Sequence, residues 1–351
     1  MTRHGGNMAR KGRRKQFAVP TVLVAAGLLA IALPGEAFAH VKWFAPYDVA
    51  QQPLPLRQVF TPSFWQFTAT AAVILWLLSY IERHALGDAI TGSLERFSVP
   101  LRPRIEALYR GGTAVFFGAL FAIGGIIMTP ELKTDWQAIS WLQAAIALGM
   151  FWSVTMPLSA VGIALLYAYG VYTYGIFHML DYPIFLGLAA YLGLTGLKLE
   201  LFHLRPLDVA RWSASLTLMW ASIEKWAYPD WTYPLLQKYP EVGFNLQPTF
   251  YMTAAGVLEF SLAFALLWTP MVRRVAALVL AMMFVSAVAE FGKIDAIGHM
   301  MIVVILVGII ADDRPNVKHQ PLLAPLSYGG ALAIYLAAYY GLHAVIYGTT
   351  L

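Results

Sequence analysis

The feature that most constrains this chain is a series of apolar segments of about the length of a transmembrane helix. They lie at residues 64–81, 110–128, 138–155, 158–177, 183–198, 209–227, 249–268, 273–290, 296–311 and 325–347. A helical span needs about 20 apolar residues. Inside a bilayer every backbone polar group must be satisfied within the protein, which favours helices. The sequence therefore predicts an all-α, polytopic membrane bundle with about ten spans.

The composition supports this class and narrows the partners. Hydrophobic residues make up 59% of the chain and charged residues 12%, so the lipid bilayer is the expected environment. The net charge of +5 comes from residues before Phe17 and between the spans, and no arginine-rich stripe with interleaved aromatics is present. We therefore expect no nucleic-acid partner. The chain has no Cys, which excludes disulfides, thiolate metal ligands and thiol redox chemistry.

Residues 1–39 have the three parts of a secretory signal peptide. A basic region at 10–15 precedes an apolar run at 17–33, and Ala37-Phe38-Ala39 has the small-x-small pattern that signal peptidase cleaves. Cleavage there makes His40 the first residue of the mature chain. The alternative is an uncleaved anchor helix, although the apolar run is short for a span.

The distribution of basic residues predicts the orientation of the mature chain. Residues 40–60 form an extracytoplasmic N-terminal segment, and 61–109 hold the first span and a cytoplasmic loop. The inner side then carries Arg83, Arg96, Arg102, Arg104, Arg110, Lys198, Arg205, Arg211, Arg273, Arg274, Arg314 and Lys318, and the outer side carries Lys42, Arg57, Lys133, Lys225, Lys238 and Lys293. Because cytoplasmic loops are enriched in Lys and Arg, we expect a multi-pass protein of the bacterial inner membrane with an extracytoplasmic N-terminus.

Short matches along the chain suggest an internal repeat. Ile176-Phe177-His178-Met179 is echoed by Ile297-Gly298-His299-Met300, and a Trp followed by Thr and Pro precedes both matches. We predict two tandem four-helix units, at 110–198 and 209–311, with a final span at 325–347. In the first unit, Gly118, Gly124 and Gly125 are expected to let helices approach closely.

Ionisable residues are concentrated in the second unit, within or beside segments that a bilayer would otherwise keep apolar. They are Glu224, Lys225, Glu259, Glu290, Lys293, Asp295 and His299. Such residues usually face the bundle interior and mark a proton, ion or substrate site. The first five are the candidate catalytic residues. The predicted topology gathers all of them near the outer face except Glu259, which lies midway along its span and needs Lys225 or Lys293 as a partner.

The carboxyl groups of this set outnumber its ammonium groups. At least one carboxyl is therefore left to share a proton, bind a cation or accept a hydrogen bond. We expect Glu259 to be a proton-exchanging carboxyl. The alternative is a set of ion pairs that only holds the helices together. The aromatic and Pro-rich outer loop at 228–248 is either an interfacial cap on the bundle or a lid over this site.

Several motifs of the second unit resemble the DoxX/DoxD group of four-helix membrane proteins. They are Arg211-Trp212, Glu224-Lys225-Trp226-Ala227-Tyr228-Pro229, Gly256-Val257-Leu258-Glu259, Arg273-Arg274-Val275-Ala276-Ala277-Leu278 and Gly298-His299-Met300. The resemblance implies a membrane component of sulfur or thiol redox chemistry linked to quinone, acting with a soluble or membrane redox partner. His299 and Trp226 are the candidate quinone-binding residues.

Two other functions stay open on the sequence. An N-terminal His40 can chelate copper through its amino nitrogen and imidazole, with His178, His299 and Met300 as further candidate ligands. Haem ligation between His178 and His299 is a related possibility. A noncatalytic membrane anchor or assembly subunit predicts neither metal nor quinone, and a charged cluster that is completely paired.

Overall fold

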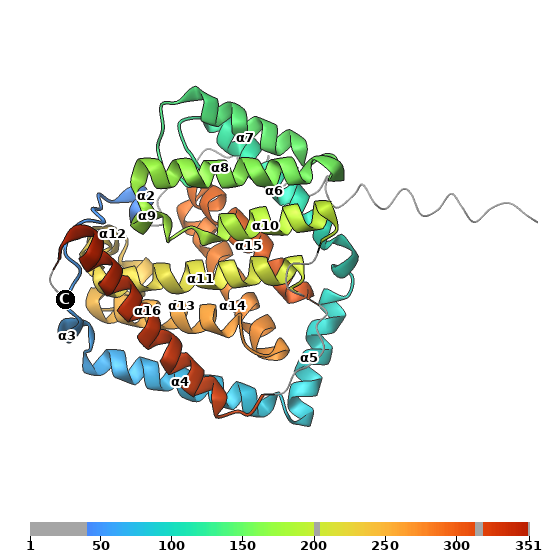
Figure 1. The fold of residues 1–351 in the computed structure, drawn as a ribbon. Coiled ribbons are helices and arrows are strands. Elements are labelled where there is room, and N and C mark those ends of the chain that lie inside the picture. Colours follow the sequence, from blue (N-terminus) through green and yellow to red (C-terminus); the bar gives the residue numbers. More distant parts are fainter. Residues whose placement is uncertain (1–40, 200–203, 313–318, 350–351) are drawn as a thin grey trace, which may run out of the picture.

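The computed structural model describes residues 41–199, 204–312 and 319–349, and every regular element in these ranges is a helix (Figure 1). The fold class is therefore all-α, as predicted. The expected signal peptide at 1–39 and the expected mature N-terminus, His40, lie outside the described residues.

Each predicted apolar segment contains a long helix. The helices are α4 (Pro62–Ile81), α6 (Ile105–Ile123), α7 (Gln137–Gly149), α8 (Met156–Tyr174), α10 (Pro183–Leu197), α11 (Pro206–Ala227), α13 (Pro248–Ala265), α14 (Pro270–Phe291), α15 (Lys293–Ala311) and α16 (Leu323–Tyr347). In α4, α8, α10, α11, α13 and α14 a proline occupies the first or second helical position. Proline is favoured there because its fixed φ suits the helix and its missing N–H is not needed.

Within the described ranges, five helices are long and apolar enough to cross a membrane. They span Pro62–Ile81, Ser153–Tyr174, Pro270–Val288, Lys293–Ala311 and Leu323–Tyr347. The mean hydropathy of Lys293–Ala311, 2.4, is the highest of the five. These helices are consistent with a multi-pass membrane protein.

Other helices fill the connections. They are α2 (Val41–Phe44), α3 (Leu56–Val59), α5 (Ala85–Ser98), α9 (Ile176–Met179) and α12 (Tyr233–Lys238), with 3₁₀ turns that include η4 (Pro229–Trp231) and η5 (Pro240–Gly243). The expected cytoplasmic loop after the first span therefore contains the helix α5. The search for long apolar runs missed it because polar and charged residues interrupt its sequence.

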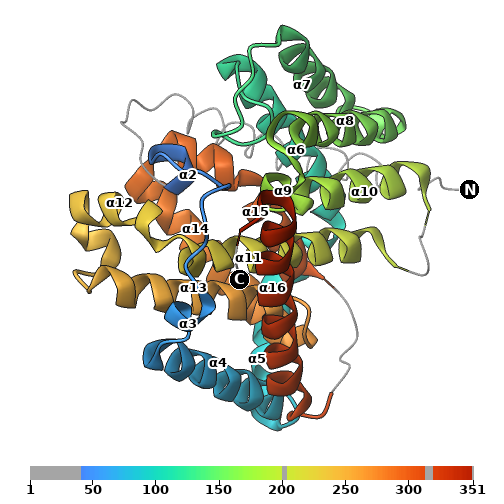
Figure 2. The ribbon, with the colours of Figure 1, turned by 60° about the vertical axis from the view of Figure 1, so that its left-hand side comes forward.

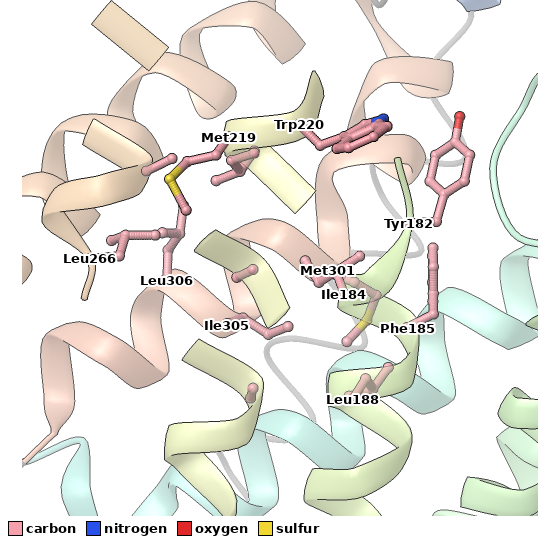
Figure 3. Packing of buried hydrophobic residues seen from close by; sticks show 14 of the residues in the cluster. Tyr182, Ile184, Phe185, Leu188, Met219, Trp220, Leu266, Met301, Ile305 and Leu306 are labelled. Carbon is pink, nitrogen blue, oxygen red and sulfur yellow. The ribbon is translucent and has the colours of Figure 1, made fainter. Parts of the chain in front are cut away.

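The long helices pack side by side, and their two ends differ. Helix α10 lies against α8 and α11, while α15 lies against α6 and α14. Side chains of α10, α11 and α15 meet in a buried core that includes Ile184, Leu188, Met301 and Ile305 (Figure 3). Helices α2, α3, α9 and α12 lie at one end of the bundle, and α5 lies at the other (Figures 1 and 2).

Glycines allow close contact where the two predicted units meet, but they are not the glycines we expected. A Cβ at Gly187 of α10 would collide with Ser213 of α11, and a Cβ at Gly112 of α6 would meet Val304 of α15 at 2.7 Å. In contrast, a Cβ at Gly118 would meet nothing within 4 Å, so its expected packing role is wrong. Gly124 and Gly125 have positive φ values of 71° and 67°, and they serve to turn the chain after α6.

Hydrogen bonds join residues 49–54 to the C-terminal helix α16 and to the end of α11. His343 Nε2 of α16 donates to the Val49 carbonyl at 2.9 Å, and the Tyr340 hydroxyl donates to the Leu54 carbonyl at 2.8 Å. The Leu54 N–H donates to the Ala227 carbonyl at the end of α11 at 2.8 Å. These bonds fix residues 49–54 at the end of the bundle that carries α2.

The opposite end holds a network of arginine ion pairs, which we call the arginine end. Its members are Arg102, Arg205, Arg211, Arg273 and Arg274 with Glu95, Asp208 and Asp312. Asp312, which follows α15, accepts from Arg205 at 2.5 Å and lies 3.4 Å from Arg273. These pairs join the ends of α5, α11, α14 and α15.

Candidate functional site

A cavity of about 290 Å³ lies at the end of the bundle that carries α2 and α12. Its wall is mainly apolar and includes Trp43, Phe185, Tyr251 and Phe284. The carboxyl groups that line it belong to Asp181, Glu224, Glu259 and Asp295, the ammonium groups to Lys42 and Lys225, and the imidazole to His299. A mainly apolar cavity with a few converging polar groups is the usual form of a small-molecule site.

Lys42 of α2 is buried between two carboxylates. Its Nζ donates to Asp181, which follows α9, and to Glu224 of α11 at 2.5 Å. Nζ also lies 5.6 Å from the centre of the Tyr47 ring and 5.7 Å from that of Trp231. Burial alone would lower the pKa of Lys42, but the two carboxylates raise it above its ordinary value. Lys42 is therefore held as an ammonium ion.

The neighbouring Trp43 holds α2 on the other side of the cavity. Its ring lies against Gly298 of α15, where any Cβ would collide with it. The ring centre is 5.1 Å from that of His299. Helix α2 thus connects Asp181 and Glu224 with the start of α15.

Lys225 and Glu259 form a second ion pair on the cavity. Lys225 Nζ donates to Glu259 Oε2 at 2.7 Å, and their side chains are 22% and 18% exposed. The expected pairing of Glu259 with Lys225 is confirmed. Successive helical residues point about 100° apart, which explains why Glu224 faces Lys42 while Lys225 faces α13.

The start of α15 supplies a third pair. Asp295 Oδ1 lies 3.0 Å from His299 Nδ1, one helical turn away. Asp295 is completely buried, and the His299 ring also contacts Phe284 of α14 at 4.6 Å between ring centres.

More titratable groups surround the Lys42 site on the side of the first unit. Tyr182 donates to Glu131, and burial raises the pKa of this Glu131 carboxyl. The His178 ring lies among the rings of Tyr47, Tyr174 and Tyr182. Burial, assisted by the charge of Lys42, lowers the pKa of His178 to about 3. His178 is therefore a neutral imidazole at physiological pH.

The structure brings together only part of the predicted catalytic set. Glu224, Lys225 and Glu259 line the cavity, whereas Lys293 is not among the residues that line it. The side chain of Glu290 lies outside the described part of the structure. The prediction that charged groups of several helices share one cavity is thus met by three of its five candidate catalytic residues.

The candidate quinone-binding residues separate. His299 lines the cavity, but Trp226 does not. The Trp226 ring packs against Phe64 of α4 and against Gly256 of α13, and its Nε1 donates to the Thr253 carbonyl at 3.3 Å. Trp226 therefore has a packing position in the core.

The candidate copper ligands do not form a cluster within the described ranges. His40 lies outside them, and His178 and Met300 are not among the residues that line the cavity. No group of three or more His, Asp or Glu side chains placed to hold a metal ion occurs in the described residues. The copper and haem hypotheses stay predictions.

Sequence reasoning missed Lys42 and Asp181 as members of the site. Both lie outside the long apolar segments, where no periodicity predicts which surface a residue faces. The signal that could have found Lys42 is the charge excess itself, because a buried Glu224 needs a cation and its own helix offers none on the same face.

The segment at 228–248 also contributes to the cavity. The wall includes Trp231 of η4, Thr232 between η4 and α12, and Leu235 and Leu236 of α12. Trp231 stacks on Tyr228, with ring centres 4.1 Å apart. Of the two roles expected for residues 228–248, a cover over a site therefore fits the structure, since this segment forms part of the cavity wall.

The charges of the cavity do not balance as ammonium and carboxylate. Four carboxyl groups line it and only two ammonium groups do, counted over the described residues. At least two of these carboxyl groups therefore have no ammonium group of their own on the cavity wall.

Comparison of the chain with protein-family models, with curated proteins and with solved structures gave no match.

Proposed function

We propose that this chain is a DoxX-like, quinone-linked redox component of the bacterial inner membrane, which binds a quinone in the cavity and exchanges protons with it. The single observation that carries the proposal is the excess of carboxyl over ammonium groups in one mainly apolar cavity. An apolar wall suits a quinone ring, and carboxyl groups that share protons suit its reduction.

The proposed topology has all ten long helices in the membrane, after removal of the signal peptide. The mature N-terminus and the cavity face the extracytoplasmic side, and the arginine end faces the cytoplasm. The arginine pairs at α11, α14 and α15 support this orientation, because Lys and Arg concentrate on the cytoplasmic side of membrane proteins.

The chemistry assigned to the residues is proton transfer. Reduction of a quinone to a quinol adds two electrons and two protons, which convert two C=O groups into C–OH groups. We assign proton supply to Glu259, beside Lys225, and to His299, beside Asp295. The electrons come from a sulfur compound through a redox partner, as the resemblance to the DoxX/DoxD group implies.

The charge count also weighs against a purely structural cluster. A noncatalytic anchor predicts that each carboxylate of the site has its own cation. Asp181 and Glu224 instead share the single ammonium of Lys42. Burying two carboxylates beside one cation is costly unless a proton joins them, which is the property that a proton-exchanging site needs.

Quinone binding can be tested by fluorescence of the detergent-purified protein, because Trp43 and Trp231 line the cavity. Titration with decylubiquinone is expected to quench tryptophan emission with saturation. Decylbenzene, which has the same tail and no carbonyl groups, is the matched control. In a Trp43→Phe/Trp231→Phe variant the saturable component should disappear.

The Glu259→Gln variant tests the role of the carboxyl. It should weaken decylubiquinone binding by about tenfold, which is the loss expected for one charge-assisted hydrogen bond. It should also flatten the dependence of binding on pH. Quenching that never saturates, or that decylbenzene reproduces, would overturn the proposal, and so would a Glu259→Gln protein with unchanged affinity and pH profile.

A further inference from the structure

The surroundings of Lys42 have the composition of a site for an alkylammonium ion. Asp181 and Glu224 are 5% and 9% exposed, and both accept hydrogen bonds from the Lys42 ammonium. The Trp231 ring, 6% exposed, completes the site at 5.7 Å from Nζ. Buried carboxylates and aromatic faces are what proteins use to recognise ammonium groups of ligands.

The components of this site come from separate parts of the chain. Asp181 follows α9 in the first predicted unit, Glu224 lies in the last turn of α11 in the second, and Trp231 belongs to η4. Lys42 belongs to the four-residue helix α2. The chain that follows α2 is hydrogen-bonded to α16 at Val49 and Leu54. The cation is thus supplied by a segment that is distant in sequence from both carboxylates and meets them through the Lys42 side chain.

Residues 42 and 43 also close the cavity. Lys42 contacts α11, Trp43 packs against Gly298 of α15, and both side chains line the cavity. Between this contact and the fixed residues 49–54 lie residues 44–48, of which Pro46 and Asp48 are exposed. A short exposed connection between two attached regions is where such a segment can bend.

We propose that Asp181, Glu224 and Trp231 form an ammonium-binding site that the chain fills with its own Lys42, and that residues 42–47 are thereby held as a lid on the cavity. An alkylammonium group of a ligand that enters the site displaces Lys42 and opens the lid. The inference concerns access to the cavity and does not depend on which molecule the cavity binds.

The lid can be tested by the reactivity of a single cysteine, because the chain contains no Cys of its own. Thr232 lines the cavity and is 8% exposed, so Thr232→Cys reports access to it. A bulky charged maleimide should modify this cysteine slowly in the parent and about tenfold faster or more after Lys42→Ala, since the closed state loses its ion pairs. Glu241→Cys, at an exposed position, should react equally fast in both.

A second route to the open lid leaves the ion pairs in place. Gly298→Ala puts a Cβ where the Trp43 ring lies and should also increase the reactivity of Thr232→Cys. Gly118→Ala, where a Cβ meets nothing within 4 Å, is the matched control and should not. Folding of each variant is checked by circular dichroism and by gel filtration in detergent.

The ammonium site can be tested by chemical rescue of Lys42→Ala. Butylammonium replaces the lost cation, so it should raise the Tm of the Lys42→Ala protein with saturation. Because it is not joined to residues 42–47, it should leave the modification of Thr232→Cys fast. Butyramide and sodium chloride at equal concentration should not raise the Tm. In a Lys42→Ala/Asp181→Asn/Glu224→Gln variant, which lacks the buried charges and so stays foldable, butylammonium should have no effect.

Two results would overturn the inference. One is equal reactivity of Thr232→Cys in the parent, in the Lys42→Ala protein and in the charge-free triple variant. The other is a response of Lys42→Ala to butylammonium that sodium chloride matches. Neither measurement uses a quinone, so failure of quinone binding and failure of the lid are distinguishable.

Discussion

The two ends of the bundle both concentrate charged side chains, but the excess charge has opposite sign. The arginine end has five guanidinium groups paired with three carboxylates, counted over the ion pairs of the described residues: Arg102, Arg205, Arg211, Arg273 and Arg274 with Glu95, Asp208 and Asp312. The cavity end has four carboxyl groups and two ammonium groups. The arginine end therefore has an excess of guanidinium groups, and the cavity end has an excess of carboxyl groups.

An excess of arginine is permanent, whereas an excess of carboxyl groups can be adjusted. Arginine stays protonated at any physiological pH, so its charge can anchor helices and fix orientation but cannot exchange protons. A buried carboxyl group becomes neutral by taking up a proton. Under the proposed function, ion pairs at the arginine end hold helices together, and those at the cavity end also take part in proton exchange.

The largest effect is expected from removing the central carboxylate of the arginine end. Asp312→Ala leaves Arg205 and Arg273 without their shared acceptor. Because Arg273 is buried, unfolding of the detergent-purified protein should become easier by about 3–5 kcal/mol. Glu106→Ala, which breaks a pair with Arg110 whose carboxylate is 50% exposed, is the control and should cost at most about 1 kcal/mol.

Asp312→Ala should leave decylubiquinone binding unchanged in the folded fraction, measured by tryptophan quenching. Loss of binding at an equal concentration of folded protein would contradict a purely structural role for the arginine end, because its residues would then also affect quinone binding. Equal costs for Asp312→Ala and Glu106→Ala would show that the network does not hold the helices together.

An intermediate effect is expected at the Lys225–Glu259 pair, which is partly exposed. Lys225→Met leaves the Glu259 carboxylate without its donor and should cost about 1–3 kcal/mol. Lys225→Met/Glu259→Leu removes both charges and should regain most of that stability. A double-mutant cycle by urea unfolding gives the coupling energy.

The same double variant should not regain quinone binding, since the proton-exchanging carboxyl is gone. Recovery of both stability and binding would contradict this prediction. It would mean that the Lys225–Glu259 pair only stabilises the fold, like the ion pairs at the arginine end. Lys225→Arg keeps the charge and serves as the conservative control.

The smallest effect concerns the pH dependence of stability at Glu131. Its pKa in the folded chain is raised by burial, so the folded state binds a proton that the unfolded state has already lost at the same pH. Stability from this group is therefore lost as pH rises above its ordinary pKa, by at most about 1.4 kcal/mol per pH unit. Glu131→Gln should remove this slope and be the more stable protein at pH 8.

Urea unfolding between pH 5 and pH 8 measures the slope for Glu131→Gln and for the parent. Glu241→Gln, at an exposed position, is the control and should keep the parental slope. An unchanged slope in Glu131→Gln would contradict the prediction, because it would mean that burial does not raise the pKa of the Glu131 carboxyl.

The positions of the long helices could be predicted from sequence because apolar length and proline starts are local signals. The range predicted as 183–198 is the helix Pro183–Leu197, and 325–347 is Leu323–Tyr347. The end of α6 was placed too late, at 128, because Gly124 and Gly125 turn the chain inside an apolar run. Helix α5 was missed because its apolar residues are interrupted.

The site was less accessible to prediction because its partners are distant in sequence. Glu224, Lys225, Glu259 and His299 were found through their conflict with an apolar surrounding, which is visible in each helix alone. Lys42 and Asp181 were not, since they stand in polar connections where a charge is ordinary. Their importance arises only from the contact across 139 residues that brings Lys42 to Asp181.

The hydrogen bonds from α16 to residues 49–54 have a consequence for biogenesis. The segment that carries Lys42 leaves the ribosome before any of the long helices. The carbonyl groups of Val49 and Leu54 in this segment cannot be paired as in the structure until His343 and Tyr340 of α16 have been synthesised. The cavity end therefore reaches its final form only after translation of the whole chain. A product truncated before α16 would contain the other long helices and still lack both donors that fix residues 49–54.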